Sequence, residues 1–224
     1  MELLTIGHSN LSIEAFIALL KEHRVTAIVD VRSHPYSRYA PHFSQAALKC
    51  SLQAVGIAYV FLGKELGARS TDPTCYDEQG KVIYDRLAQT TLFAEGMKRL
   101  TIGMQKYRVA LMCAEKDPIA CHRSILICDR LKQQNLSLRI SHILSDGTLE
   151  THEQLEERLL ANLAQPPQLP ELEQLWQAVE TQATKAKKRA KQPTSLPLLE
   201  RLDQLKQANS QQEREIAYSK PLSS

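Results

Sequence analysis

The sequence contains no apolar run close to the roughly 20 residues that a membrane-spanning helix needs. Its N-terminal stretch, MELLTIGHSN, lacks the basic start, the long apolar segment and the small-residue cleavage site of a secretory signal. The cysteine count of five is odd, and without a secretory signal it favours free thiols over a disulfide framework. We therefore expect a cytoplasmic protein with reduced cysteines.

Three common catalytic signatures are also missing: the Walker phosphate loop, the GxGxxG dinucleotide loop and the HExxH metal motif. Their absence argues against the usual NTPase, dinucleotide and zincin chemistries. The net charge of +3 is too small to indicate nucleic-acid binding by itself. With 43% hydrophobic and 24% charged residues, the composition is that of a soluble globular protein.

Short apolar runs alternate with helical patterns over the first two-thirds of the chain. Strand-like runs cover residues 3–7, 26–32, 57–62, 107–113 and 138–144. Helical patterns cover residues 12–23, 44–55, 83–105 and 121–134, and residues 63–82 form a long loop that is rich in Gly, Asp, Thr and Pro. Because the strands are apolar on both faces, we predict an α/β fold: a mostly parallel sheet with helices on both faces.

Ligands in such folds bind beyond the carboxyl ends of the strands. Three polar clusters follow predicted strands: Gly7-His8-Ser9, Asp30-Val31-Arg32 and Cys113-Ala114-Glu115. These clusters, far apart in the sequence, should therefore meet at one edge of the sheet.

The composition changes after Ala164, where PPQLP resembles a linker. We predict an α/β domain over residues 1–164 and a helical, partly disordered basic extension over residues 165–224. The segment KAKKRAK could bind nucleic-acid phosphates through Lys185, Lys187, Lys188, Arg189 and Lys191. A solvated helical face is the alternative interpretation of this segment.

The segment CAEKDPIACHRS places two cysteines between a strand and a helix. A helix N-terminus lowers the pKa of a nearby thiol, and His122 and Arg123 add positive charge. Cys121 could therefore be a nucleophilic or redox-active thiolate, and Arg123 could hold a phosphate or a carboxylate. Buried, inert cysteines are the alternative.

The spacing within this segment excludes several specific sites. It contains neither a Cys-x5-Arg phosphatase loop nor a CxxC redox pair. Cys113, Cys121, His122 and His8 are residue types that bind zinc. However, only Cys121 and His122 are close in sequence, and adjacent residues are expected to point in different directions. The sequence therefore predicts no metal site.

A second cluster, DVRSHPYSRYAPHF, carries Arg32, His34, Arg38 and His42 among aromatic residues. Arginine forks bind phosphate or carboxylate, and aromatic rings stack on bases or sugars. The alternative is a solvated loop in which Asp30 pairs with Arg32.

Other polar residues carry weaker signals. Ser9 and its neighbours could have no role beyond capping the following helix. His142 lies in the last predicted strand and could be a core histidine, while His152 more plausibly begins a helix than belongs to a site.

Together these motifs resemble a known family. TIGHS, VDVRSHPYSR, PHF, GIAYVFLGKELG, LMCAEKDPIACHRSIL and ISHIL…DG are similar, in this order, to the family called domain of unknown function 488. The resemblance runs from about residue 3 to 150. It implies a compact α/β domain in a cytoplasmic protein and supplies no established activity.

Two functional hypotheses follow. The first is an enzyme, a hydrolase or transferase, that acts on a phosphate- or nucleotide-like anion, with no cofactor indicated. Its candidate catalytic residues are Cys113, Glu115 and Cys121, and its candidate substrate-binding residues are His8, Ser9, Asp30, Arg32, Arg38, His42, His122 and Arg123. The second is a non-catalytic module that binds a nucleotide or nucleic acid. A closed pocket would favour the enzyme, and an open basic groove would favour the module.

Overall fold

The computed structural model describes residues 1–164 and 198–217. Its centre is a six-stranded sheet of strand order β3-β2-β4-β1-β5-β6. The strands are β1 (Glu2–Gly7), β2 (Ala27–Asp30), β3 (Ala58–Phe61), β4 (Val109–Cys113), β5 (Arg139–Ile143) and β6 (Leu149–Thr151). All neighbouring pairs are parallel except β5 and β6, which are antiparallel. The predicted α/β class and the mostly parallel sheet are confirmed.

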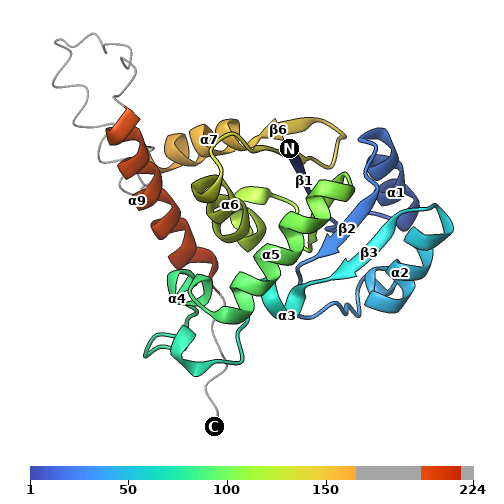
Figure 1. Ribbon diagram of the computed structural model, residues 1–224, viewed down its shortest axis with the longest axis horizontal. Coiled ribbons are helices and arrows are strands. Elements are labelled where there is room, and N and C mark those ends of the chain that lie inside the picture. Colours follow the sequence, from blue (N-terminus) through green and yellow to red (C-terminus); the bar gives the residue numbers. More distant parts are fainter. Residues whose placement is uncertain (165–197, 218–224) are drawn as a thin grey trace, which may run out of the picture.

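Helices cover both faces of the sheet (Figure 1). One face is covered by α1 (Ile13–Glu22) and α2 (Gln45–Ala54), which bury Phe16, Leu48 and neighbouring apolar side chains against it. The opposite face is covered by α3 (Gly63–Leu66), α4 (Tyr84–Ala88), α5 (Thr91–Lys106) and α6 (Asp129–Gln134). Burial of apolar area at about 25 cal/mol per Å² is the main force that holds these layers together.

The alternation of side chains along β4 decides which face each of its residues meets. Ala110 and Met112 lie in the core under α1 and α2, whereas Val109, Leu111 and Cys113 face the α5 and α6 side. Cys113, the last residue of β4, therefore faces the α5 and α6 side of the sheet.

Two predicted helices differ in detail from the structure. The pattern over residues 83–105 is divided into α4 and α5, because the Thr90 hydroxyl caps the second helix by accepting from the Phe93 amide at 3.2 Å. The helix predicted from residue 121 begins with a π-helical segment, η4 (Arg123–Cys128), before α6. Such π-helical turns are frequent at functional sites.

The remaining elements were not predicted as helices or strands, apart from the helix start at His152 and the helical character of the C-terminal extension, in which α9 (Leu198–Ile216) lies. The long loop contains α3, a short 3₁₀ turn, η2 (Pro73–Cys75), and a bridge between Tyr76 and Val82. Further 3₁₀ turns are η1 (Pro41–Phe43) and η3 (Pro118–Ala120). After β6, the helix α7 (His152–Ala164) begins at His152, as predicted.

The C-terminal helix α9 (Leu198–Ile216) lies beside α7 (Figure 1). Its Ala208 packs in a small apolar cluster with Ile119 and Leu159. Lys81 also donates a hydrogen bond to the carbonyl of Arg214 near the end of α9. The domain boundary at residue 164 stays a prediction, and the basic segment at 185–191 lies outside the described residues.

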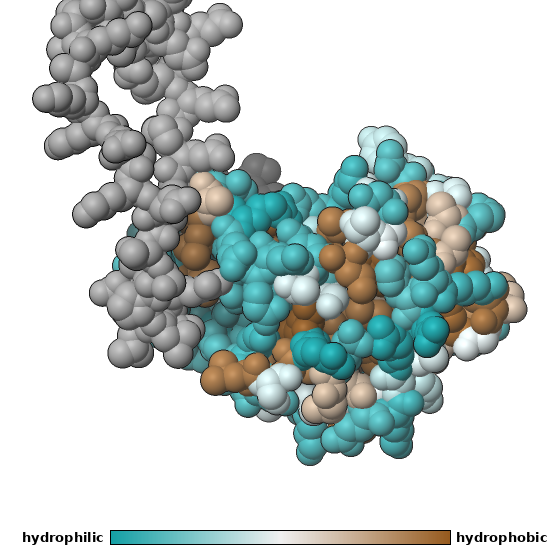
Figure 2. Space-filling model, turned by 90° about the horizontal axis from the view of Figure 1, so that it is seen from above, coloured by the Kyte–Doolittle hydropathy of each residue, from teal (hydrophilic) through white to brown (hydrophobic). Residues whose placement is uncertain are grey.

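The surface of the described residues is mostly hydrophilic in the view from above, and its hydrophobic side chains form separate patches (Figure 2). None of the helices in the described ranges combines the length and apolar character that a membrane crossing requires.

A buried histidine pair links β5 to α7. His142 is fully buried, and hydrogen bonds join its Nδ1 to Thr5 Oγ1 at 2.8 Å and its Nε2 to His152 Nδ1 at 3.1 Å. Burial lowers the pKa of His142 well below its usual range and the pKa of His152 to about 4. Both rings are therefore neutral at pH 7, which fits the expectation of a core histidine at position 142.

This pair should make the fold sensitive to acid. As the pH falls from 6.5 toward 4, the unfolded chain binds protons that the buried rings do not accept, so the free energy of unfolding should decrease. The loss should reach about 1.4 kcal/mol per pH unit for each such group. Urea unfolding at pH 7 and pH 5 measures it. His152→Gln should reduce the decrease, while His34→Gln, at an exposed position, should leave it unchanged. An equal decrease in all three proteins would contradict this account.

Candidate active site

The three predicted strand ends meet at the carboxyl edge of the sheet. The His8 amide donates to the Cys113 carbonyl at 2.9 Å, and the Val31 amide donates to the Met112 carbonyl at 3.1 Å. The segments after β1, β2 and β4 are thus held side by side by backbone hydrogen bonds. The predicted convergence of these clusters is confirmed.

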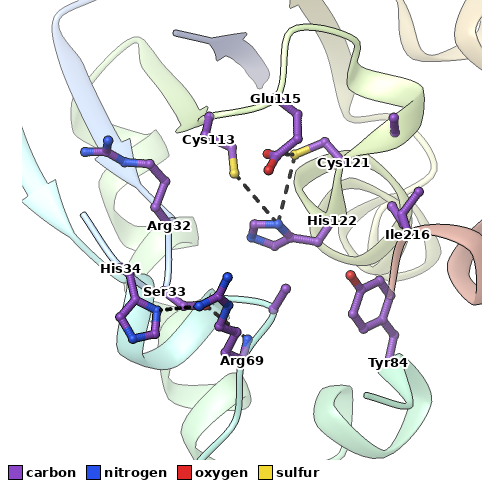
Figure 3. Close-up of a pocket in the computed structure, with 13 residues that line it drawn as sticks. Arg32, Ser33, His34, Arg69, Tyr84, Cys113, Glu115, Cys121, His122 and Ile216 are labelled. Carbon is purple, nitrogen blue, oxygen red and sulfur yellow. Dashed lines mark hydrogen bonds between the residues drawn. The ribbon is translucent and has the colours of Figure 1, made fainter. Parts of the chain in front are cut away.

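Asp30 and Arg32 form a buried ion pair at this edge. Arg32 Nε donates to Asp30 Oδ1 at 2.9 Å and Arg32 Nη2 donates to Asp30 Oδ2 at 2.7 Å. The same guanidinium also donates to the Phe43 carbonyl at 2.8 Å, while the Tyr59 hydroxyl donates to Asp30 at 2.8 Å. Because its donors are directed to these partners, the Arg32 head points away from the cysteines (Figure 3).

His8 completes this buried network. Its Nε2 accepts from Arg32 Nη1 at 3.1 Å, so its Nδ1 carries the proton and donates to the Ser9 carbonyl at 2.9 Å. Burial and the Arg32 charge lower the pKa of His8 to about 4. The ring stacks on Phe43 with 4.3 Å between centroids. His8 is therefore a neutral, positioned side chain that orients Arg32.

Four side chains form a second cluster, which we call the thiol centre: Cys113, Glu115, Cys121 and His122. Their donor atoms all lie within 4.8 Å of one another. The His122 Nδ1 lies 3.8 Å from Cys113 Sγ and 4.0 Å from Cys121 Sγ, and a hydrogen bond of 3.1 Å joins Cys121 Sγ to Glu115 Oε2. All four point to one place (Figure 3).

The backbone explains how two adjacent residues reach one centre. Cys121 is extended, with φ −138° and ψ 135°, and His122 follows in helical conformation with φ −57° and ψ −23°. The change of conformation between them turns both side chains inward. The expectation that Cys121 and His122 would point in different directions is therefore wrong.

Arg123 fixes the loop that carries Glu115. This fully buried guanidinium donates to the Glu115 carbonyl at 2.8 Å, to the Lys116 carbonyl at 3.3 Å and to Thr5 Oγ1 at 3.3 Å. The loop also passes directly over Gly7, where a Cβ atom would lie 1.9 Å from the Glu115 carbonyl oxygen. Only glycine permits this approach of the two backbones.

Gly7→Ala should therefore displace the Glu115 loop and lower the free energy of unfolding by roughly 1–3 kcal/mol or more. Thermal unfolding measures the effect. Gly103→Ala is the matched control, since no atom lies within 4 Å of the added Cβ in helix α5. That variant should gain up to about 1 kcal/mol from helix propensity. A Gly7→Ala protein as stable as the wild type would contradict the close packing.

The pKa values of the groups in the thiol centre are shifted in opposite directions. Burial opposes the Cys121 thiolate, but hydrogen bonding with Cys113 and the charges of Arg123 and His122 hold the pKa of Cys121 well below its usual range. The hydrogen bond with Cys121, together with burial, raises the pKa of Cys113. Burial and the negative charge of Cys121 raise the pKa of Glu115. The centre thus pairs an electron-rich sulfur with a carboxyl group that can keep its proton.

The thiol centre lies at one side of a pocket of about 280 Å³ (Figure 3). Arg69 and His34 line another part of its wall, with Arg69 Nη1 3.3 Å from His34 Nδ1. Tyr84 of α4 and Ile216 of α9 line it as well. Segments from the sheet edge, the long loop and the C-terminal helix therefore share one cavity.

A family model described as domain of unknown function DUF488 matches residues 12–128, more than half of the chain. The chain belongs to this family. The match includes the thiol centre and Arg69 but neither His8 nor α9, so it is shorter than the resemblance from residue 3 to 150. No curated protein and no solved structure matches the sequence.

Within this DUF488 chain, the predicted site residues fall into three groups. Cys113, Glu115, Cys121 and His122 line the pocket. His8, Asp30, Arg32 and Arg123 form the buried supports beside it, and of these only Arg32 contributes to the lining. Ser9, Arg38 and His42 are not among the lining residues. Arg38 is exposed, and a hydrogen bond of 3.0 Å joins His42 Nε2 to the Leu11 carbonyl.

Sequence reasoning missed the pocket's exposed arginine. Arg69 lies in the segment 63–82, whose length as a loop is itself a signal of function. Within the DUF488 match, Arg69 is held beside Ser33, whose hydroxyl accepts from the Arg69 amide at 3.0 Å. No short-range pattern around Arg69 predicts that contact.

Proposed function

We propose that the protein is an enzyme, a hydrolase or transferase, that acts on a small ligand with a phosphate or carboxylate group. The observation that carries the proposal is the thiol centre, which shares a pocket with Arg69. A pocket of about 280 Å³ suits a small anionic ligand, such as a phosphorylated metabolite or nucleotide fragment, better than a nucleic-acid strand.

The positions of the residues in and around the pocket indicate a different role for each. Arg69, exposed at the wall of the pocket, offers a guanidinium fork for the anionic group. Cys121 is the electron-rich group nearest Glu115, and Glu115 is the candidate proton carrier because its pKa is raised. Arg32 and Arg123 act as positioning residues, since their guanidinium groups are directed to buried partners.

The alternative is a non-catalytic module that binds a nucleotide or nucleic acid. Lys185, Lys187, Lys188, Arg189 and Lys191 are the residues on which nucleic-acid binding would depend, and they lie outside the described residues. Duplex DNA binding through this segment would weaken steeply with added salt. Binding of a small anion in the pocket would respond to Arg69 instead.

Calorimetric titration of the full chain with inorganic phosphate and with nucleoside monophosphates tests this function. Arg69→Ala should weaken binding by roughly 10- to 100-fold, because a charge-assisted hydrogen bond contributes about 1.5–3 kcal/mol. Arg38→Ala is the matched control: it removes an exposed arginine that does not line the pocket. Equal affinities for wild type and Arg69→Ala, or equal losses in both variants, would contradict the proposal.

A further inference from the structure

The thiol centre has the composition of a metal site. Two cysteine sulfurs, an imidazole nitrogen and a carboxylate oxygen are the donor types that zinc prefers. In this chain they come from β4, the loop after it and the two residues directly before η4, and three of the four residues are buried. The donor atoms are already gathered in one place, since all of them lie within 4.8 Å of one another.

The separations between His122 and the two sulfurs are close to those around one tetrahedral ion. With Zn–S near 2.3 Å and Zn–N near 2.0–2.1 Å, tetrahedral geometry places a nitrogen and a sulfur about 3.6 Å apart. The His122 Nδ1 lies 3.8 Å and 4.0 Å from the two sulfurs. Closing these distances requires shifts of a few tenths of an ångström.

The orientation of the His122 ring supports a metal site independently of these distances. Its Nε2 lies 3.1 Å from the Val31 carbonyl, which can only accept, so Nε2 carries a proton and donates it. The other nitrogen, Nδ1, therefore faces the sulfurs and is available as a ligand when it is deprotonated. A metal-binding histidine usually donates its second N–H to a carbonyl or carboxylate, which fixes the ring in this way.

The support of Glu115 differs from that of the cysteines. Arg123 holds its backbone carbonyl at 2.8 Å, but the residue as a whole is exposed on its loop, although its carboxyl group turns inward to Cys121. Glu115 is therefore the ligand that can leave most easily. Sites with three firm protein ligands and one exchangeable position are typical of catalytic zinc, whereas four firm ligands are typical of structural zinc.

We propose that Cys113, Cys121 and His122 bind a zinc ion, with Glu115 as an exchangeable fourth ligand. The role of the exchangeable position rests on the proposed function: an oxygen of the anionic ligand would replace Glu115 and would be polarised by the metal. In that case the two sulfurs act as ligands, and Cys121 does not attack the substrate itself.

Titration of the reduced full chain with Co²⁺, followed by Zn²⁺ competition, tests the site. The expected result is one equivalent of cobalt, with a sulfur-to-cobalt charge-transfer band and the intense visible bands of tetrahedral cobalt, all lost when zinc is added. Cys113→Ser and His122→Asn should each weaken binding by about 100-fold or more, since even residues that merely support ligands contribute 10- to 100-fold. Glu115→Gln should retain the charge-transfer band.

Cys128→Ala is the matched control, because Cys128 is buried in the same segment but does not line the pocket. It should bind cobalt as the wild type does. No charge-transfer band in the wild type, or an unchanged band in Cys113→Ser and His122→Asn, would overturn the metal site. The readout uses the metal alone, so it is separate from the proposed function. If cobalt fails to bind while phosphate binding still depends on Arg69, only the metal site is lost.

Discussion

Replacing Cys121 with serine should reduce turnover of the anionic substrate by on the order of a thousandfold or more, as removal of a central reacting group does in other enzymes. The reason holds whether the sulfur attacks the substrate or binds a metal. In both cases the thiolate is required, and a serine hydroxyl does not ionise near neutral pH. Cys121 lines the pocket and lies 3.1 Å from Oε2 of Glu115, the candidate proton carrier.

The control for this variant is Cys128→Ala, which removes a buried sulfur from the same segment. Its cost should appear in stability rather than in turnover. Turnover is measured with phosphorylated and carboxylated compounds that bind to the wild type in calorimetry. Equal turnover by wild type and Cys121→Ser would show that the thiol centre is not the reaction centre.

The largest expected effect on stability comes from Asp30→Ala. This substitution leaves the Arg32 charge without its partner in a site where the two side chains are 5% and 0% exposed. Removal of one member of a buried ion pair costs about 3–5 kcal/mol. Denaturant unfolding at pH 7 measures this loss.

Asp85→Ala is the matched control for Asp30→Ala. Asp85 pairs with Arg130, but its side chain is 71% exposed. Exposed ion pairs contribute about 1 kcal/mol or less. If the two substitutions have similar costs, the Asp30–Arg32 pair does not hold the sheet edge together as the hydrogen bonds indicate.

The sequence was sufficient for the five parallel strands of the sheet, because apolar runs bounded by turn residues depend only on local chemistry, but it did not predict the short antiparallel strand β6. It also located Cys113, Glu115 and Cys121 at one edge, since parallel strands place their carboxyl ends together. It could not show where the Arg32 guanidinium points. The sequence is compatible with both roles of Arg32, anion binding and pairing with Asp30. In the structure Arg32 pairs with Asp30.

The features that the sequence did not reveal depend on contacts between distant segments. Arg69 reaches the pocket because its segment packs against Ser33, and Ile216 reaches it because α9 folds back. The inward direction of both Cys121 and His122 depends on one change of backbone conformation, which residue spacing does not encode. The division of the 83–105 pattern had a local cause in Thr90, a capping residue that the helical periodicity obscured.

The most direct test of the central claim is a crystal structure of the full-length Cys121→Ser variant with a bound nucleoside monophosphate. The account predicts that the phosphate lies in the pocket, within hydrogen-bond distance of Arg69 and next to residues 115 and 121. A phosphate bound elsewhere, for example at Arg38 or on the basic segment 185–191, with the pocket left empty, would contradict it.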